Sequence, residues 1–174
     1  MGKGLPRSLG GGRGGYQAQV VSKLRVGIDH TVTVTATGAA IGFGSVVLSG
    51  LPEGQIKMLG AAIAVTFSGS GADANLADTF DGDFGVGTTP AGDATITGTD
   101  VNVIASTALG AATAEVSPLK NVINGTDAVF DNTAADLELN LNVLIDAANI
   151  TDDTSVDLQA QGVIEFTFIT LLDD

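Results

Sequence analysis

Strict alternation of apolar and polar residues is the feature that most restricts how this chain can fold. The segment 136–146 reads DLELNLNVLID, so aliphatic residues occupy one parity while glutamate and asparagine occupy the other. The segment His30–Thr37, HTVTVTAT, alternates threonine with β-branched or small apolar residues in the same way. A period of two places alternate side chains on opposite faces of a strand. Both segments therefore predict half-buried β-strands.

Further strands are predicted wherever short apolar or β-branched runs lie between turn-forming residues such as Gly50–Gly54 and Thr89–Asp93. The candidates are Gln17–Val26, Ile41–Leu48, Gln55–Phe67 (with a possible break at Gly60), Ala94–Thr97, Val101–Ala105, Ala112–Val116, Ala128–Phe130, Val156–Ala160 and Val163–Leu172. The change of apolar parity near Gly162 predicts a β-bulge at that glycine. Ala72–Thr79 and Ala108–Ala114 could each form one or two helical turns.

Eight to ten short strands in about 150 residues indicate an all-β protein, either a sandwich or a closed barrel. We expect a jelly-roll-like β-sandwich, because its long C-terminal strands would then pair in the middle of a sheet. The expected division is an N-terminal arm over residues 1–16 and a β-sandwich body over residues 17–174.

Charge is distributed very unevenly along the chain. The first 25 residues hold five basic residues and no acidic one, whereas residues 26–174 hold two basic residues and all twenty carboxylates. Residues 1–25 therefore carry a formal charge of +5 and residues 26–174 a charge of −18, which gives the net charge of −13. Seven of the first fifteen residues are glycine, which predicts an extended, flexible arm. No apolar stretch typical of a secretory signal follows the charges, so we expect synthesis and use without export.

A basic arm on an acidic body predicts docking to an acidic partner. Nucleic acid is a weaker alternative, because the body would repel phosphates and aromatic residues are scarce. We therefore expect an acidic protein surface as the partner. The candidate docking residues are the basic side chains and the single tyrosine of this region, namely Lys3, Arg7, Arg13, Tyr16, Lys23 and Arg25.

The composition argues against catalysis. The chain contains no Cys, no Trp and a single histidine, His30, so neither a thiol nucleophile nor a two-histidine metal site can be built from one copy. Paired carboxylates could in principle cleave glycosides, but the aromatic platforms that usually accompany them are missing. We expect a protein that is not an enzyme and uses no cofactor. The longest apolar runs are also too short for a membrane helix.

The densest acidic cluster includes Asp78, Asp81 and Asp83 on a glycine-containing segment. Hard cations such as Ca²⁺ bind several oxygen ligands on such loops, yet this spacing does not match the twelve-residue calcium loop. A solvated acidic loop is the default interpretation, no metal site is assigned, and cation binding is left open.

Several motifs in the body resemble small virion proteins of tailed bacteriophages, in particular capsid decoration (cement) proteins. The resemblance spans about residues 40–172 and is carried by GFGSVVL (42–48), LPEG (51–54), FSGSGAD (67–73), LADT (76–79), GVGTTP (85–90), FDNT (130–133), the strand 137–144 and ITDD (150–153). Proteins of this family bind the outside of the major capsid protein's shell and reinforce it, commonly as homotrimers. The N-terminal arm lies outside the matched part.

The resemblance implies a structural virion protein that is made in the host cytoplasm and located on the capsid exterior. Its partners would be the major capsid protein and further copies of itself, with no membrane and no nucleic acid. Other virion components, such as a tail-tube or head-fibre protein, remain alternatives. A carbohydrate-binding β-sandwich module is another, although it would need exposed aromatic side chains.

Overall fold

The computed structural model describes residues 21–37, 40–69, 74–124, 128–134 and 136–171. Nine β-strands and two short 3₁₀ helices lie in these ranges, and no longer helix does. In chain order they are β1 (Val21–Thr35), β2 (Gly42–Gly50), β3 (Gly54–Ser68), β4 (Gly82–Gly87), η2 (Gly98–Asp100), β5 (Ile104–Ala108), β6 (Lys120–Asn124), β7 (Val129–Asn132), β8 (Glu138–Ile145), η3 (Ala147–Asn149) and β9 (Ser155–Leu171).

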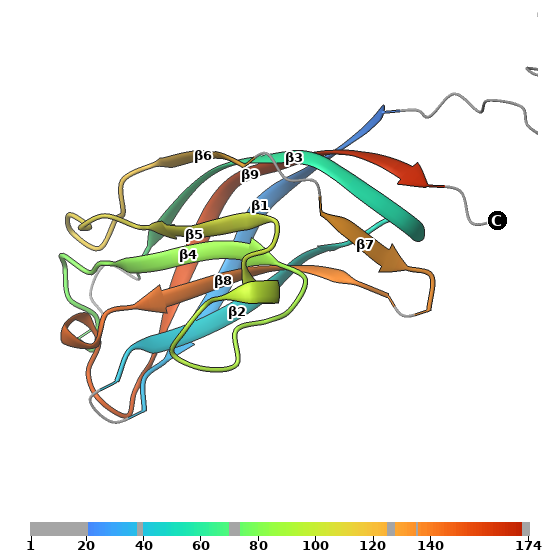
Figure 1. Cartoon of the computed structure of the whole chain (residues 1–174). Helices are drawn as coiled ribbons and strands as arrows, with labels where there is room; N and C mark the ends of the chain where they lie inside the picture. Colours follow the sequence, from blue (N-terminus) through green and yellow to red (C-terminus); the bar gives the residue numbers. More distant parts are fainter. Residues whose placement is uncertain (1–20, 38–39, 70–73, 125–127, 135, 172–174) are drawn as a thin grey trace, which may run out of the picture.

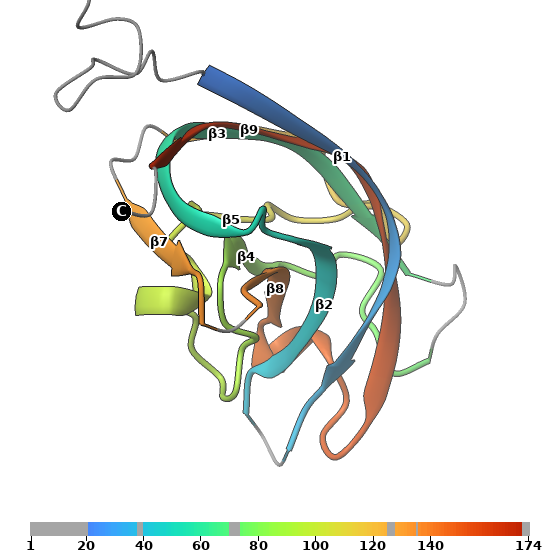
Figure 2. The same ribbon diagram turned by 90° about the vertical axis from the view of Figure 1, so that its right-hand side faces the viewer.

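The strands form one strongly curved antiparallel sheet in the order β5-β4-β8-β2-β1-β9-β3-β6, with β7 paired to β3. The strands β1 and β2 share only the register pair Thr35 and Phe43, and from that corner the sheet folds back over itself. Two layers result, one of β1, β9, β3 and β6 and the other of β2, β8, β4 and β5 (Figures 1 and 2).

The pairing follows the pattern of a long hairpin rolled into a sandwich. The first and last strands of the chain, β1 and β9, pair with each other. Moving inward along the sequence, β2 pairs with β8, β3 with β6 and β7, and β4 with β5. This nesting is the topology of a jelly roll. The predicted jelly-roll-like sandwich is therefore confirmed, and the long C-terminal strand β9 lies between β1 and β3 in the middle of its layer, as expected.

The core lies between the two layers and is built from inward residues of alternate parity. On β1 these include Val32 and Val34, and on β3 they include Ile63, Val65 and Phe67, all at most 3% exposed. The rings of Phe67 and Phe84 meet across the layers with their centroids 5.5 Å apart. Burial of alternate apolar residues from both layers is the main stabilising contribution expected for a sandwich of this kind.

The predicted β-bulge at Gly162 is wrong. Gly162 pairs in unbroken register with Ile28 on one side and Val65 on the other, and the even-numbered residues before and after it, from Val156 to Phe168, are buried on the same face. A Cβ atom on Gly162 would lie 2.0 Å from the carbonyl oxygen of Ala64, so glycine is required by the close approach of the neighbouring backbone. The register of β3 instead shifts between Met58 and Gly60, although the strand continues through that point.

Several other predicted elements differ from the structure. Ala94–Thr97 belongs to the connection between β4 and β5, and Ala112–Val116 reverses direction through the positive φ angles of Ala114 and Glu115, so neither segment is a strand. The described part of Ala72–Thr79 forms turns, and Ala108–Ala114 leaves β5 without becoming helical. The strands β4 and β6 were not predicted, because the glycines of β4 and the short run of β6 are typical of turns.

Candidate docking face

The two layers differ in what covers their outer sides. The segment 88–103 crosses the outer side of the β2-β8-β4 layer and is anchored there by Asn142, which is fully buried. The Asn142 Nδ2 donates to the carbonyl oxygens of Thr89 (3.0 Å) and Asp100 (2.7 Å), and its Oδ1 accepts from the Ala91 amide (2.8 Å). The prediction that Asp136–Asp146 is half-buried is therefore wrong, because residues 139–145 of β8 are buried on both faces.

The outer side of the β1-β9-β3-β6 layer, called the open face below, is not crossed by any described segment (Figure 2). All eight outward residues of β1, from Val21 to Thr35, are exposed, while the inward Ile28, Val32 and Val34 are buried. This alternation is what a sheet with one solvated side shows. A partner could therefore approach the open face directly.

One half of the open face is polar and internally hydrogen-bonded. Thr33 Oγ1 donates to Asp157 Oδ1 (2.7 Å), Thr31 Oγ1 donates to Gln159 Oε1 (3.1 Å), and Gln159 Nε2 donates to Asp29 Oδ1 (2.8 Å). The threonines of the segment His30–Thr37 thus stabilise the pairing of β1 with β9 across the strands. Since their hydroxyl groups already have partners, this half is a poor site for specific recognition.

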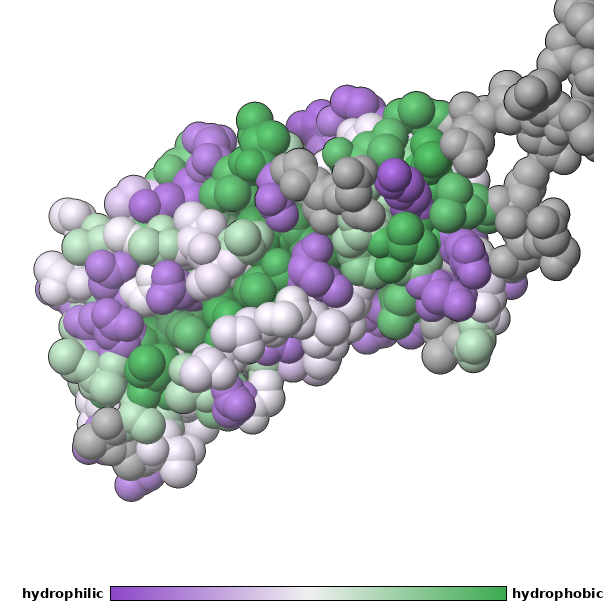
Figure 3. Space-filling view, in the orientation of Figure 1, coloured by the Kyte–Doolittle hydropathy of each residue, from purple (hydrophilic) through white to green (hydrophobic). Residues whose placement is uncertain are grey.

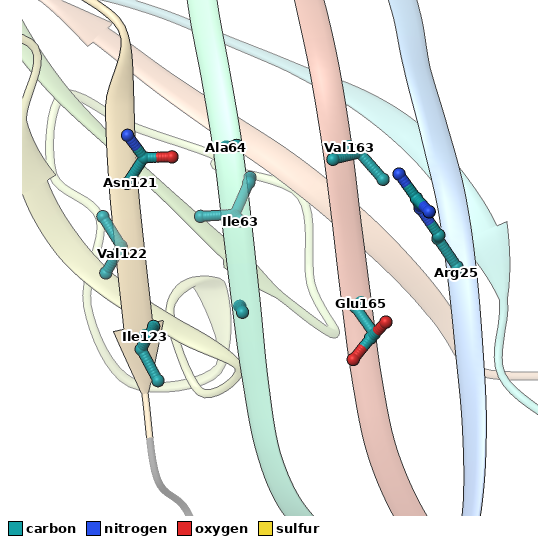
Figure 4. Close-up of a pocket in the computed structure, with 9 residues that line it drawn as sticks. Arg25, Ile63, Ala64, Asn121, Val122, Ile123, Val163 and Glu165 are labelled. Atoms are coloured by element: carbon teal, nitrogen blue, oxygen red, sulfur yellow. The ribbon is translucent and has the colours of Figure 1, made fainter.

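The other half of the open face contains a shallow apolar hollow of about 330 Å³ (Figure 4). The floor of the hollow is formed by short side chains, because Ala62 and Ala64 of β3 occupy outward positions between longer side chains. Ile123 of β6 stands beside Ala62 and is 87% exposed, while Val163 and Glu165 of β9 lie on the other side. Exposed apolar side chains that are contiguous with an apolar hollow are a feature of interaction surfaces.

Further apolar side chains are exposed on the same layer. Three of the seven large apolar residues that are exposed in the described part of the chain lie on its outward positions, and they are Val21, Leu59 and Ile123. Leu59 lines a second hollow of about 290 Å³ that shares Ala62, Ile123 and Glu165 with the first. Figure 3 shows apolar side chains at the surface along the upper side of the molecule, where β3 and β6 lie.

Two of the predicted docking residues lie beside this hollow. Arg25 of β1 lines it opposite Glu165, and Lys23 Nζ forms an ion pair with Glu165 Oε1 at 2.6 Å. The hydrogen bond and positive charge of Lys23, with a smaller contribution from Arg25, lower the pKa of the Glu165 carboxyl below its usual value. The other predicted docking residues, Lys3, Arg7, Arg13 and Tyr16, lie outside the described residues.

The sequence-based prediction found the basic rim of the hollow and missed its apolar part. The strand β6 was not predicted, so Ile123 was not assigned to a face. The available signal was weak, since only the pair Val122 and Ile123 before the turn-forming Asn124 suggested a strand.

The remaining candidate groups do not come together as a chemical site. Among the described residues, no group of three or more His, Cys, Asp or Glu side chains is arranged to hold a metal ion. Asp81 Oδ1 accepts from the Gly82 amide, and His30 is half-buried on β1 opposite Ala160. No helix in the described ranges is long and apolar enough to cross a membrane.

Asp83 lies where its negative charge is unfavourable. Partial burial, and then the charges of Asp146 and Asp81, raise the pKa of Asp83 above its usual value. A raised folded-state pKa means that stability falls as pH rises from the unfolded-state pKa through the folded-state pKa. We expect Asp83→Asn to raise the free energy of unfolding at pH 7 by less than about 1 kcal/mol, because the group is largely solvated. Urea titrations of the variant and the wild type at pH 7 and below pH 3 measure this difference in the free energy of unfolding. An equal increase in stability at both pH values would contradict the prediction, because the carboxyl group is uncharged below pH 3.

Comparison with known proteins gives structural similarities only, since no family profile and no curated protein matches the chain. A CBM4 carbohydrate-binding module matches 82% of this chain and 94% of its own, with a TM-score of 0.43 and 18% identity. A chain of the cyanophage Pam1 capsid asymmetric unit matches 88% of this chain and 86% of its own, with a TM-score of 0.37 and 18% identity.

A chain of infectious bursal disease virus, Gt strain, matches 84% of this chain but only 32% of its own length, with a TM-score of 0.36 and 11% identity. All three TM-scores lie below 0.5. The jelly-roll assignment therefore rests on the strand order of this chain, and no function is transferred from these structures.

Proposed function

We propose that this protein is a non-catalytic structural component of a virion that attaches to the outside of an assembled capsid shell and reinforces it. The open face is the docking surface, and the basic N-terminal arm adds attraction for an acidic shell. The partner is the major capsid protein, and further copies of the chain associate with it on the shell, as a homotrimer in the form that the sequence resemblance implies.

The observation that supports this role is the asymmetry between the two layers. One layer is sealed by the segment 88–103, whereas the other exposes Ile123 over an apolar hollow with Lys23 and Arg25 at its rim. Ile123, which is 87% exposed, forms an apolar patch with Leu59 around two adjoining hollows, and protein interfaces combine such an apolar centre with a charged rim. In the sequence, three further basic residues, Lys3, Arg7 and Arg13, precede β1.

A carbohydrate-binding role has less support from the surface. Stacking on a sugar ring requires an exposed aromatic side chain. Six of the seven phenylalanines are buried and Phe43 is half-buried, so no aromatic residue in the described part of the chain is exposed. The open face instead offers aliphatic side chains and charges, which suit a protein partner.

The docking face is tested by sedimenting the protein with assembled shells that lack it. We expect Ile123→Asp to weaken binding at least about tenfold, because it places a charge in the apolar centre of the interface. Since Ile123 is 87% exposed, the variant should keep the melting temperature of the wild type. Removal of residues 1–15 should also weaken binding and reduce its dependence on salt.

Val47→Asp is the matched control, because Val47 is 42% exposed on β2 in the other layer. This variant should bind shells as the wild type does. Wild-type affinity in Ile123→Asp would exclude the open face as the docking surface. If the unmodified protein itself does not sediment with shells, the capsid role is wrong.

A further inference from the structure

The strand β1 has an unpaired edge over its first half. It pairs with β9 along its whole length, from Val21 opposite Ile169 to Thr35 opposite Ser155. On its other side it pairs with β2 only at Thr35 opposite Phe43, and Figures 1 and 2 show β1 and β2 diverging from that corner. Over Val21–Gly27, here called the free edge, no described residue of the chain pairs with the side of β1 that faces away from β9.

The side chains along the free edge alternate in character. Lys23 and Arg25 point outward on the open face and are exposed, while Leu24 and Val26 point inward and are only half-buried. Both inward residues pack against the core, but part of each side chain stays exposed. A strand added at this edge would therefore cover the apolar side chains on one face and meet positive charges on the other.

An unpaired strand edge presents a row of backbone N–H and C=O groups that can bind another extended segment. In such strand addition, the main-chain hydrogen bonds supply affinity, and alternate side chains supply specificity. We propose that the free edge of β1 binds an extended segment of the partner protein in which acidic side chains alternate with aliphatic ones. The acidic side chains lie opposite Lys23 and Arg25, and the aliphatic ones lie beside Leu24 and Val26.

The charges argue for a different protein as the occupant, not a second copy of this chain. The free edge is centred on Leu24, so antiparallel pairing of two copies about that residue would oppose Lys23 to Arg25 twice. Like charges directly opposite each other destabilise a strand pair. The N-terminal segment of another copy is also unfavourable, because residues 1–20 contain three basic residues and no acidic one.

The inference rests on the proposed function for the source of the segment, which is the capsid shell protein. The free edge and the hollow of the open face lie on the same layer and share Arg25 at their border. A partner bound over the hollow can therefore extend one segment along β1 without crossing to the other layer.

Peptide binding tests the free edge without a shell. The probe is a capped peptide as long as the free edge that alternates valine with glutamate, and the full-length chain is observed by NMR with amide hydrogen exchange. We expect the peptide to slow exchange at alternate residues of Val21–Gly27, which are the amides that point away from β9. Two control peptides should not produce this protection. One alternates valine with lysine, and the other is the valine–glutamate peptide with N-methyl groups on the amides that would donate to β1.

The double substitution Lys23→Gln/Arg25→Gln should lower the affinity for the valine–glutamate peptide about tenfold. The matched control is Lys57→Gln/Lys120→Gln, which removes the same charge from β3 and β6 and should leave the affinity unchanged. Lys23 and Arg25 are both exposed, so the melting temperature of the double variant should stay close to that of the wild type.

Three outcomes would overturn the inference. Equal binding of the valine–lysine peptide would show that the edge does not select for charge. In the free protein, slow exchange of the β1 amides that point away from β9, as well as of those that point toward it, would show that the chain covers its own edge. Protection that appears with protein concentration alone would assign the edge to a second copy. If the peptide binds as expected while the protein fails to sediment with shells, the strand-addition site stands and only the capsid role is wrong.

Discussion

Replacing Gly162 by alanine should lower the free energy of unfolding by about 3 kcal/mol, which is large for one added methyl group. Gly162 lies in the middle of β9, the strand that joins β1 to β3. A Cβ atom there would lie 2.0 Å from the carbonyl oxygen and 2.9 Å from the carbonyl carbon of Ala64. The obstacle is backbone, not a side chain that could rotate away, so the central pairing of the layer would have to shift.

Gly27→Ala is the control for this prediction. Gly27 is the neighbour of Ile28, which is the register partner of Gly162, yet a Cβ atom on Gly27 would meet nothing within 4 Å. Alanine there should be neutral or stabilise by up to about 1 kcal/mol, because glycine is unfavourable inside a strand. Urea unfolding of the two variants measures the difference, and equal stabilities would show that the approach of β3 to β9 does not require glycine.

Asn142→Ala should also lower the free energy of unfolding, by about 3 kcal/mol. The substitution would leave the carbonyl oxygens of Thr89 and Asp100 and the amide of Ala91 without this partner, in a region where Asn142 itself has no exposed surface. Ser45 Oγ, which donates to Asn142 Oδ1 at 2.5 Å, would lose this acceptor and keep only the bond that it accepts from the Ala91 amide (2.8 Å). We further expect faster amide exchange over residues 88–103, because this side chain attaches that segment to β8.

Asn121→Ala provides the matched asparagine control. Asn121 is exposed on β6, and its replacement should change stability by no more than about 0.5 kcal/mol. If Asn142→Ala unfolds at the same urea concentration as Asn121→Ala, the polar network under the segment 88–103 would contribute little. The seal over that layer would then depend on packing alone.

These two predictions bear on function because they concern the two layers separately. Gly162 supports the strand register of the layer that carries the open face, whereas Asn142 keeps the opposite layer covered. A variant of Asn142 should therefore become less stable while the hollow beside Ile123 stays intact. Its shell binding per folded molecule is expected to match that of the wild type.

The candidate site was predicted in part from the sequence. Charge asymmetry alone identified Lys23 and Arg25, since all basic residues before position 26 precede every acidic one. Ile123 was missed, because β6 is five residues long and ends at a turn-forming asparagine. A short strand becomes recognisable only through its pairing with β3, which is a contact between segments about 60 residues apart.

Local alternation determined the all-β class and the strands with a clear period of two, such as β1 and β8, because this period is a property of neighbouring residues. It did not determine which polar faces meet solvent. The threonines of β1 and the asparagines of β8 follow the same pattern, yet the first are exposed and Asn142 is fully buried. Only the tertiary structure decided this, since the segment 88–103 packs over one layer and leaves the other open. Whether a segment packs over the outer face of a sheet depends on distant parts of the chain, so it cannot be predicted from local periodicity.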